Sequence, residues 1–415
     1  MDLLWPAWKL RRLSRATAVS LMAHALEGLR VLDVTQVMAG PFCAMLLCDM
    51  GADVIKVEAP SGDSSRRMAG AIGSDSAAFN AVNRGKRSIV VDLKTQQGVA
   101  IVCGLAATAD VFVENFRPGV MAKLGLGYDV LRGDNPKLIY ASISGYGQTG
   151  PASQKGGFDL VAQGVSGLMS VTGEPGRPPT KVGVPVTDLG AGLFALCGIL
   201  AALQHRERTG DGQFIDAALV DSGLALSVWE VTELFSRGDV PQPLGSAHRM
   251  SAPYQAIRCS DGFITLGAAN DRLFERLTKL LGHPEWCMDS RFASDSERVA
   301  NRTTLAAAIE AVTLEHSCAH WLRELDARDI PCGPINTYQD VIVDPQVNAR
   351  EMVLETEHPT LGRILTLGTP IKMSETPLRP GRPAPLLGQH TDEVLREAGY
   401  NASEISEFRT AQVVR

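Results

Sequence analysis

One aspartate in this chain stands apart from the other acidic side chains. Asp188 follows an uncharged extended run, 183–187, and precedes the stretch 189–203, which contains no charged residue. This pattern places Asp188 at or near the start of an apolar helix, where the helix dipole favours an ionised carboxylate. An ionised carboxylate held in this way is a candidate nucleophile. The alternative is an N-cap, which is the common role of aspartate at a helix start.

Basic residues form a second candidate site. Three of the four residues in the segment 84–87 are cationic, and a predicted strand follows at 88–93. Such a cluster either binds the phosphates of a ligand or belongs to a solvated turn. Lys94 and the segment 115–119 fall at the ends of this strand and of the next one. Ligands of open α/β sheets bind at strand ends, which favours the phosphate interpretation.

A glycine-rich connection carries a second acidic candidate. The segments 146–151 and 156–159 are rich in glycine, and the latter ends at Asp159. A plain surface loop is the simpler interpretation of this connection. Asp159 has less apolar isolation than Asp188, which therefore stays the preferred nucleophile.

Composition excludes several classes of protein. The chain has 415 residues, of which 45% are hydrophobic and 21% charged, so it has room for two ordinary domains. A net charge of -6 and a pI of about 5.8 give no general footprint for nucleic acid. The longest uncharged run, 189–203, is short for a membrane span, so no membrane partner is expected.

Metal-binding and nucleotide-binding motifs are missing from the sequence. The eight cysteines include no C-x-x-C pair, and His316 and His320 lack the glutamate of a metalloprotease helix. The segment 35–41, after the first predicted strand, lacks the G-x-G-x-x-G fingerprint of dinucleotide sites. We therefore expect neither a metal nor NAD.

Strands alternate with helices over the first half of the chain. This alternation predicts an α/β fold with a mainly parallel, doubly wound sheet. An apolar helix is expected at 189–208, and helical periodicity dominates 271–326. The predicted strands lie at 29–34, 53–57, 88–93, 111–113, 138–144 and 214–219.

The same pattern predicts the organisation into domains. We expect a large domain at 26–236, a smaller α+β domain at 237–345 and a linker with a C-terminal segment at 346–415. Residues 1–25 form an N-terminal extension with four basic side chains and one acidic one, a composition that suits a mitochondrial transit peptide or a simple extension. A cytoplasmic location is expected, with mitochondrial targeting as the alternative.

A series of short fragments, in this order, resembles the class III CoA-transferases, the family that also contains formyl-CoA transferase, carnitine CoA-transferase and 2-methylacyl-CoA racemase. Within that family the dicarboxylate (succinyl-CoA-type) transferases look most similar. Each fragment is weak alone, but the ordered set is specific and covers nearly all of the chain after residue 25. The fragments are 34–41, 51–58, 83–88, 113–116, 144–151, 187–189, 216–219, 252–256 and 387–391.

The resemblance implies a fold and a site. The expected fold is a Rossmann-like large domain completed by the C-terminal segment, a small domain, and an interlocked homodimer. Coenzyme A is the implied co-substrate, without metal or NAD. Asp188 falls at the position of the family's nucleophile, and Gln36 is placed to donate a hydrogen bond near the reacting carbonyl. The implied coenzyme A contacts are Met38, Ala39, Val91, Asp92, Leu93, Lys94, Asn115, Phe116, Arg117, Lys123, Lys155, Gly156, Gly157, Phe158 and Asp159.

The resemblance also implies the reaction. The family moves CoA from an acyl-CoA to a second carboxylic acid through an aspartyl-CoA thioester. The alternatives are a 2-methylacyl-CoA racemase or other CoA-ester isomerase, and a non-catalytic CoA-binding protein. The racemases carry a histidine where this chain has Phe158, which cannot shuttle a proton and so favours transfer. Arg249 and nearby cations suit a dicarboxylate substrate such as succinate, or alternatively form a solvated loop.

Overall fold

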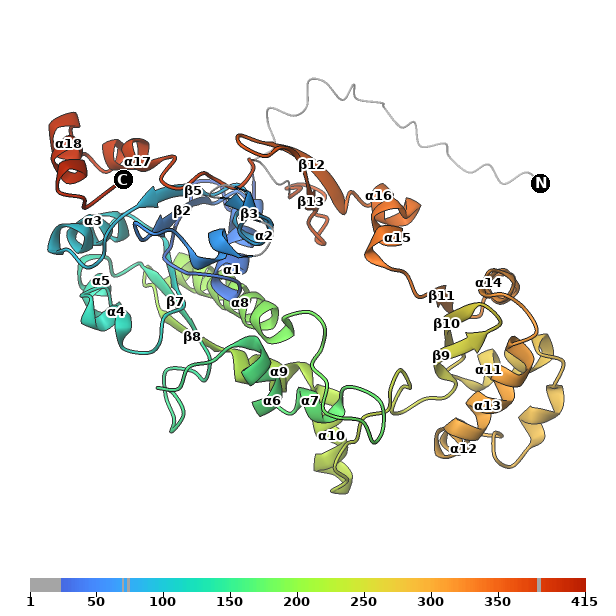
Figure 1. Cartoon of the computed structure of the whole chain (residues 1–415). Helices are drawn as coiled ribbons and strands as arrows, with labels where there is room; N and C mark the ends of the chain where they lie inside the picture. Colours follow the sequence, from blue (N-terminus) through green and yellow to red (C-terminus); the bar gives the residue numbers. More distant parts are fainter. Residues whose placement is uncertain (1–23, 69–70, 73–74, 379–381) are drawn as a thin grey trace, which may run out of the picture. The chain divides into compact units, whose positions relative to one another are not determined.

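The computed structural model describes residues 24–68, 71–72, 75–378 and 382–415, so most of the predicted N-terminal extension lies outside the described residues. The chain divides into two compact units (Figure 1). The first unit is discontinuous and comprises the chain up to Phe158 together with Thr187–Ser222 and Glu351–Arg415, while the second comprises Asp159–Val186 and Gly223–Arg350.

A six-stranded sheet organises the first unit, and all its strands run parallel. Counted along the chain, the strands have the order 3-2-1-4-5-6, which is the doubly wound arrangement of Rossmann folds. The predicted α/β fold with a parallel sheet is therefore confirmed. In spatial order the strands are β5 (Arg87–Val90), β2 (Asp53–Glu58), β1 (Arg30–Asp33), β6 (Val111–Glu114), β7 (Ile139–Ser144) and β8 (Phe214–Ala218).

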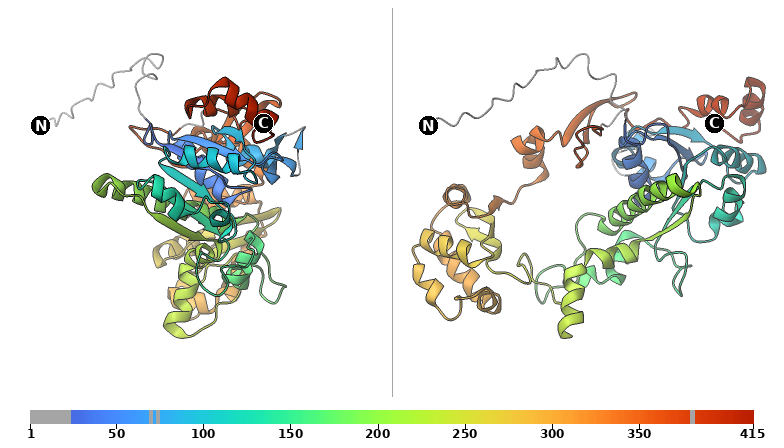
Figure 2. Two further views of the ribbon diagram at one scale, coloured as in Figure 1. Left: turned by 90° about the vertical axis from the view of Figure 1, so that its left-hand side faces the viewer. Right: turned by 180° about the vertical axis from the view of Figure 1, so that it is seen from behind.

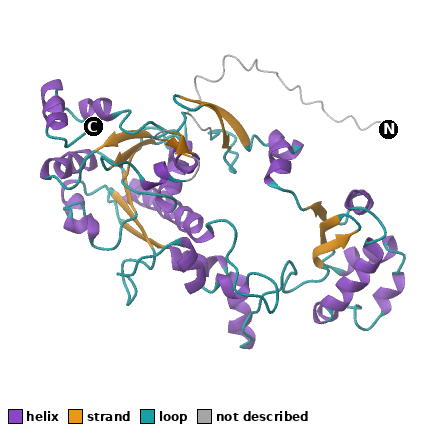
Figure 3. Ribbon diagram, in the orientation of Figure 1, coloured by secondary structure: helices purple, strands orange, loops and turns teal. Residues whose placement is uncertain are grey.

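Helices cover both faces of this sheet, as the purple ribbons around the orange strands show (Figure 3). The helices on one face bury their apolar side chains in one core with the strands; they are α3 (Gln96–Ala106), α4 (Val120–Lys123), α5 (Tyr128–Asp134), α17 (Thr391–Glu397) and α18 (Ala402–Thr410). The other helices of the sheet are α1 (Ala39–Asp49), α2 (Ala77–Asn83) and α8 (Val186–Thr209).

The C-terminal segment closes the edge of the sheet at β5. The backbone of Ser88 accepts a hydrogen bond of 2.9 Å from the amide of His390, and Asp92 donates one of 2.8 Å to Val413. Figure 2 shows the red C-terminal helices beside the blue and cyan elements of the sheet. An uncovered edge strand invites pairing with other chains, so this return of the chain protects the sheet.

The second unit is built around a three-stranded antiparallel sheet. Its apolar core lies between this sheet and helices that include α11, α13 and α14. The elements of this unit are α6 (Asp159–Val165), α7 (Leu168–Val171), α10 (Val228–Arg237), β9 (Tyr254–Cys259), β10 (Gly262–Gly267), α11 (Asp271–Leu280), η2 (Pro284–Met288), α12 (Asp295–Ala300), α13 (Arg302–Thr313), α14 (Cys318–Asp326), β11 (Cys332–Pro334), α15 (Tyr338–Val343) and α16 (Pro345–Ala349).

Short elements complete the first unit. The hairpin of β12 and β13 pairs antiparallel and belongs to the returning C-terminal part. Helix α9 runs across the boundary between the two units at Ser222. These elements are η1 (Ser64–Arg67), β3 (Ala71–Ile72), β4 (Asp75–Ser76), α9 (Leu219–Leu226), β12 (Val353–His358) and β13 (Gly362–Leu367).

Residues 159–186 and 223–236 belong to the second unit, although the large domain was predicted to span 26–236. The contacts of the segment 159–186 show why. The amide of Gly245 donates a 2.9 Å bond to the carbonyl of Gly173, which ties this segment to the rest of the second unit. Within the segment, the side chain of Gln163 accepts a 2.8 Å bond from the amide of Val182. Contacts across such distances in the chain are invisible to a pattern of local hydrophobicity.

Helix α8 begins earlier than predicted. It starts at Val186 instead of 189, so Asp188 lies within its first turn and not at its N-cap. By length and composition α8 would be long enough to cross a membrane. Its glycines pack closely on neighbouring elements of the first unit, since a Cβ at Gly198 would lie 3.0 Å from the side chain of Ile215. This packing accounts for the buried face of the helix, whereas Leu193 and Phe194 are exposed.

Candidate functional site

Most of the predicted site residues follow the carboxyl ends of neighbouring strands. Because the strands are parallel, these ends meet at one edge of the sheet. The strand order reverses between β1 and β6, which is where ligands bind in folds of this kind. Here the side chain of Asn115 accepts a bond from the amide of Gln36 and donates one to its carbonyl, each 2.8 Å long. The structure thus brings Gln36 and Asn115 together.

Helix α8 delivers Asp188 to the same region. Gly192 lies one helical turn beyond Asp188 on the same face of the helix. A Cβ at Gly192 would lie 2.7 Å from the carbonyl oxygen of Ala39 and 3.1 Å from the ring of Phe42. The face of α8 that carries Asp188 therefore packs on the first turn of α1, next to Met38 and Ala39. Asp188 itself is half-buried.

The glycine-rich connection lies against the end of β7. The backbones of Gly145 and Gly157 approach so closely that a Cβ on Gly157 would lie 2.5 Å from the Cα atom of Gly145. The guanidinium of Arg117 lies against Gly156 in the same way, 2.7 Å from where its Cβ would be. Three predicted coenzyme A contacts, Arg117, Gly156 and Gly157, are thus neighbours. The backbone approach of Gly145 and Gly157 requires glycine, whereas the flexible side chain of Arg117 could shift away from a Cβ at Gly156.

The remaining predicted contacts differ in exposure. Lys94, Lys123 and Lys155 are exposed, and the side chain of Phe158 is 78% exposed. Val91 is fully buried in the core, so its side chain is not available to a ligand, whereas Asp92 beside it is half-buried. The others in this part of the site, Leu93 and Phe116, are partly buried and pack against the core.

Asp159 is the first residue of α6 and belongs to the second unit. Its carboxylate accepts a 2.8 Å hydrogen bond from the side chain of Gln163, which also binds the amide of Val182. The interpretation of this segment as a plain surface loop is therefore wrong at its end, where Asp159 and Gln163 fix the polypeptide.

The basic segment 84–87 is neither a phosphate site nor a solvated turn. All three cations are buried in ion pairs: Arg84 with Asp49 at 2.6 Å, Lys86 with Asp33 at 2.7 Å, and Arg87 with Asp53, Glu393 and Glu397. Their charges are already neutralised by carboxylates of the same unit. Both sequence-based interpretations of this segment are corrected by the structure.

Arg249 is also paired. Its guanidinium lies 3.2 Å from the carboxylate of Glu233 and donates a 2.8 Å bond to the carbonyl of Gln242. With a side chain only 14% exposed, Arg249 does not belong to a solvated loop. Its Nε–H group is buried without a partner among the described residues.

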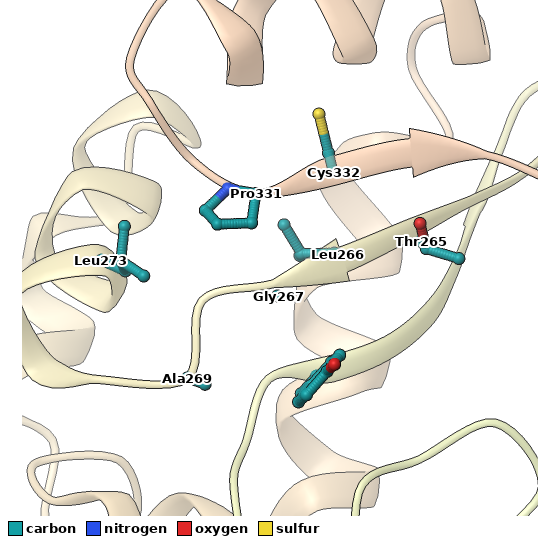
Figure 4. Close-up of a pocket in the computed structure, with 8 residues that line it drawn as sticks. Thr265, Leu266, Gly267, Ala269, Leu273, Pro331 and Cys332 are labelled. Carbon is teal, nitrogen blue, oxygen red and sulfur yellow. The ribbon is translucent and has the colours of Figure 1, made fainter. Parts of the chain in front are cut away.

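An apolar concavity of about 430 Å³ lies in the second unit (Figure 4). No residue predicted for the site from the sequence lines it. The lining residues are Tyr254, Thr265, Leu266, Gly267, Ala269, Leu273, Pro331 and Cys332.

Comparison with known proteins identifies the family. The profile of CoA-transferase family III matches residues 26–391. The chain belongs to this family. The chain is 43% identical over 380 residues to the succinate–glutarate CoA-transferase of Agrobacterium fabrum, covering 90% of this chain and 95% of the relative. It is 42% identical over 393 residues to succinyl-CoA:glutarate CoA-transferase of Homo sapiens, covering 94% and 90%.

A solved structure supports the same assignment. A CaiB/BaiF family protein from Brucella suis superposes with a TM-score of 0.81 at 41% identity, covering 90% of this chain and 99% of that one. The predicted class III CoA-transferase is therefore confirmed as the enzyme class, with CoA thioesters and carboxylic acids as the substrates of the family.

Hydrogen-bonded polar side chains in β6, β7 and β8 were not predicted from the sequence of this CoA-transferase. Glu114, at the end of β6, accepts a 2.8 Å bond from the amide of Phe116, and burial raises the pKa of Glu114 to about 7. In the next strand, the hydroxyl of Ser142 accepts a 2.8 Å hydrogen bond from the side chain of Gln148. The backbone amide of Gln148 donates a hydrogen bond to the carboxylate of Asp216. The available signal was a polar residue within or at the end of each apolar strand, where burial is expected.

We expect Gly192→Ala to displace the helix that carries Asp188. The new Cβ would meet the backbone of Ala39, which cannot move without shifting α1, so the cost is about 1–3 kcal/mol of unfolding free energy. The rate of CoA transfer should also fall, because the same displacement moves Asp188. Denaturant unfolding and a transfer assay measure both effects. Gly133→Ala is the matched control, because this helical glycine has no atom within 4 Å of its Cβ position and should lose neither stability nor activity.

We expect Glu114→Gln to change how stability depends on pH. Because the folded-state pKa of Glu114 is raised from 4.5 to about 7, the folded protein holds a proton that the unfolded chain releases, and stability falls as the pH rises through this interval. The loss is about 3 kcal/mol when complete. Glutamine stays neutral at every pH. The free energy of unfolding of the variant, measured with denaturant, should therefore rise relative to that of the wild type between pH 5 and pH 8. A stability difference that does not vary with pH would contradict the assignment.

Proposed function

We propose that this enzyme moves CoA between two dicarboxylic acids, with Asp188 as the nucleophile. The substrate class is supported by relatives that are named for succinate, glutarate, mesaconate and oxalate, at 40–43% identity. The nucleophile is supported by one structural observation above all: the face of α8 that carries Asp188 packs against the first turn of α1, beside the loop of Gln36.

The reaction conserves the thioester. The Asp188 carboxylate attacks the carbonyl carbon of the donor acyl-CoA, forming a mixed anhydride and releasing CoA thiolate. The thiolate attacks the aspartyl carbonyl, which frees the donor acid and leaves an aspartyl-CoA thioester. The acceptor carboxylate attacks this thioester and again releases thiolate. The thiolate then takes the acyl group from the second anhydride, which regenerates the Asp188 carboxylate.

Gln36 is suited to stabilise the negative charge that develops on the carbonyl oxygen in each step. Its backbone is held on both sides by Asn115, and it is half-buried at the end of β1. Its side-chain amide carries N–H donors of the kind that stabilise an oxyanion. A backbone held in this way limits the reorganisation needed to place the side-chain donor during the reaction.

The exposed cations are suited to the phosphates of coenzyme A. Lys94, Arg117, Lys123 and Lys155 all extend from segments at or after the carboxyl ends of β5, β6 and β7. They differ from the cations of the segment 84–87, which ion pairs occupy. Exposed cations attract an anionic nucleotide through charge and donate hydrogen bonds to its phosphate oxygens.

We expect Asp188→Asn to abolish transfer, by more than about 10³-fold in kcat, because asparagine cannot form the anhydride. The test incubates the protein with succinyl-CoA and a panel of dicarboxylic acids and separates the CoA esters. Asp129→Asn is the matched control, since Asp129 also lies in the first turn of a helix but belongs to α5. If Asp188 only stabilises its helix, both variants retain activity and the proposed nucleophile is wrong.

Chemical trapping of the covalent intermediate, together with isotope exchange, distinguishes a transferase from an isomerase and from a CoA-binding protein. Hydroxylamine should convert Asp188 of the wild type to a hydroxamate only after incubation with acyl-CoA, as seen by mass spectrometry. Labelling at another residue would reassign the nucleophile. Incorporation of solvent deuterium at an α-carbon without exchange of acids would instead identify an isomerase, and tight CoA binding without either reaction would identify a binding protein.

The homodimer belongs to the same proposal. Large apolar side chains are exposed on α10, where Phe235 is 81% exposed and Val228 and Trp229 are more than half exposed. Leu365 and Leu367 on β13 are exposed in the same way. Apolar groups gathered on one helix are typical of a surface that another chain covers. A second copy of this chain is the partner that we propose.

We expect light scattering to give about twice the chain mass of 44.4 kDa. Phe235→Glu should shift the protein toward the monomer, because burying an unpaired carboxylate in an interface is costly. Met288→Glu is the control, since Met288 is an equally exposed apolar residue on η2, away from α10 in the sequence. A monomeric wild type would refute the dimer.

A further inference from the structure

Four charged side chains are buried together below the loop that connects β1 to α1. They are two carboxylates, Asp33 and Asp63, and two ammonium groups, Lys56 and Lys86, and none is more than 2% exposed. Lys56 lies 3.0 Å from Asp63 and 3.9 Å from Asp33, and Lys86 lies 2.7 Å from Asp33. Burial alone would raise the pKa of Asp33, but the two lysines outweigh it and lower this pKa to about 2.

Stability alone is a weak explanation for this cluster. Removing ions from water costs about as much as their attraction returns, and buried pairs are often replaceable by apolar residues without loss. The cluster therefore calls for another role, and its remaining hydrogen bonds indicate which one.

Several of those hydrogen bonds go to the backbone of the loop and the start of α1. In addition, Asp63 caps η1 by accepting bonds from Ser65, and Lys86 donates a bond to the side chain of Asn83. Lys56 donates a 3.0 Å hydrogen bond to the carbonyl of Thr35, and the carboxylate of Asp33 accepts a 3.0 Å hydrogen bond from the backbone amide of Thr35. Asp63 accepts 3.3 Å from the amide of Val37. Lys86 donates 2.9 Å to the carbonyl of Pro41. Side chains from or beside three different strands thus hold one short backbone segment.

The segment needs to be held because its conformation is strained. Val37 has a φ of +68°, in the left-handed region that a β-branched residue rarely adopts. Such a conformation is unfavourable for valine and persists only when its surroundings enforce it. A backbone strained in this way turns Gln36 and Met38 outward, where both are half-buried, while Thr35 before them is fully buried.

We propose that Asp63 and Lys56, backed by Asp33 and Lys86, are positioning residues for the transfer reaction. They clamp residues 35–37 in the strained conformation. The clamp thereby keeps the side-chain amide of Gln36 positioned to donate to the carbonyl that Asp188 attacks. This role rests on the proposed function of Gln36 and Asp188. None of the four side chains needs to touch the substrate, because each acts through the loop.

The chain provides a matched control for this role. Asp49 pairs with Arg84 at 2.6 Å and is 2% exposed, the same exposure as Asp63. Asp49 is the last residue of α1, at the opposite end of the helix from the loop. Asp49→Asn and Asp63→Asn therefore remove equally buried carboxylates from the same unit, but only the second touches the loop.

Asp63→Asn should lower kcat by about ten- to hundredfold, the effect of misplacing a catalytic group by roughly 1 Å. Its Kd for CoA should change by less than about threefold, and Asp49→Asn should retain kcat within about twofold. Hydrogen exchange of the peptide spanning 35–38 should accelerate in Asp63→Asn and not in Asp49→Asn. Unchanged kcat and exchange in Asp63→Asn, or an equal loss in Asp49→Asn, would overturn the clamp.

A rescue variant keeps the test decisive if Asp63→Asn folds poorly. Glycine adopts a positive φ without strain, so adding Val37→Gly removes the need for the clamp. The double variant should fold and recover kcat by about tenfold relative to Asp63→Asn, or fold where the single variant does not. No recovery overturns the proposal. If the wild type transfers no CoA at all, the proposed function fails, while the exchange measurement still decides whether the clamp exists.

Discussion

The two hydrogen bonds between Asn115 and the backbone of Gln36 join the ends of β1 and β6 at the point where the strand order reverses. A doubly wound sheet leaves a crevice at this point, because the connections on its two sides leave in opposite directions. Asn115 spans the crevice and fixes where α1 can begin. The start of α1 in turn determines where α8 can pack, since Gly192 sits against Ala39. The position of Asp188 thus depends on the side-chain amide of Asn115, which directly follows β6.

Buried charge is the second common theme of the first unit. Arg66 makes ion pairs with both Glu58 and Asp75, at 2.7 and 3.0 Å, and its guanidinium stacks 3.5 Å from the centre of the Phe79 ring. Together, the ion pairs of Arg66 and the buried cluster around Asp33 form a polar interior at the carboxyl ends of the strands. The exposed lysines and Arg117 lie on segments that follow these strand ends. The buried cations are paired with carboxylates, which leaves the proposed nucleotide contacts to the exposed ones.

The sequence was sufficient for the features that depend on local pattern. The parallel sheet followed from alternating apolar segments, and the apolar surroundings of Asp188 singled out one carboxylate. The basic segment 84–87 was misinterpreted because its partners are distant: Asp49 lies 35 residues before Arg84, and Glu397 lies 310 residues after Arg87. The strain at Val37 has no sequence signal either, since valine is a residue from which no left-handed turn is expected.

The return of the C-terminal segment to β5 has a consequence for how the chain folds. The amide of Ser88 bonds to the side chain of His390, 302 residues later, and the whole second unit is encoded between them. During synthesis the second unit therefore emerges before the edge of the first sheet can be covered. Contacts of such long range slow folding and leave an open strand edge in the interim. The nascent first unit is thus the part of this protein that most needs protection from aggregation.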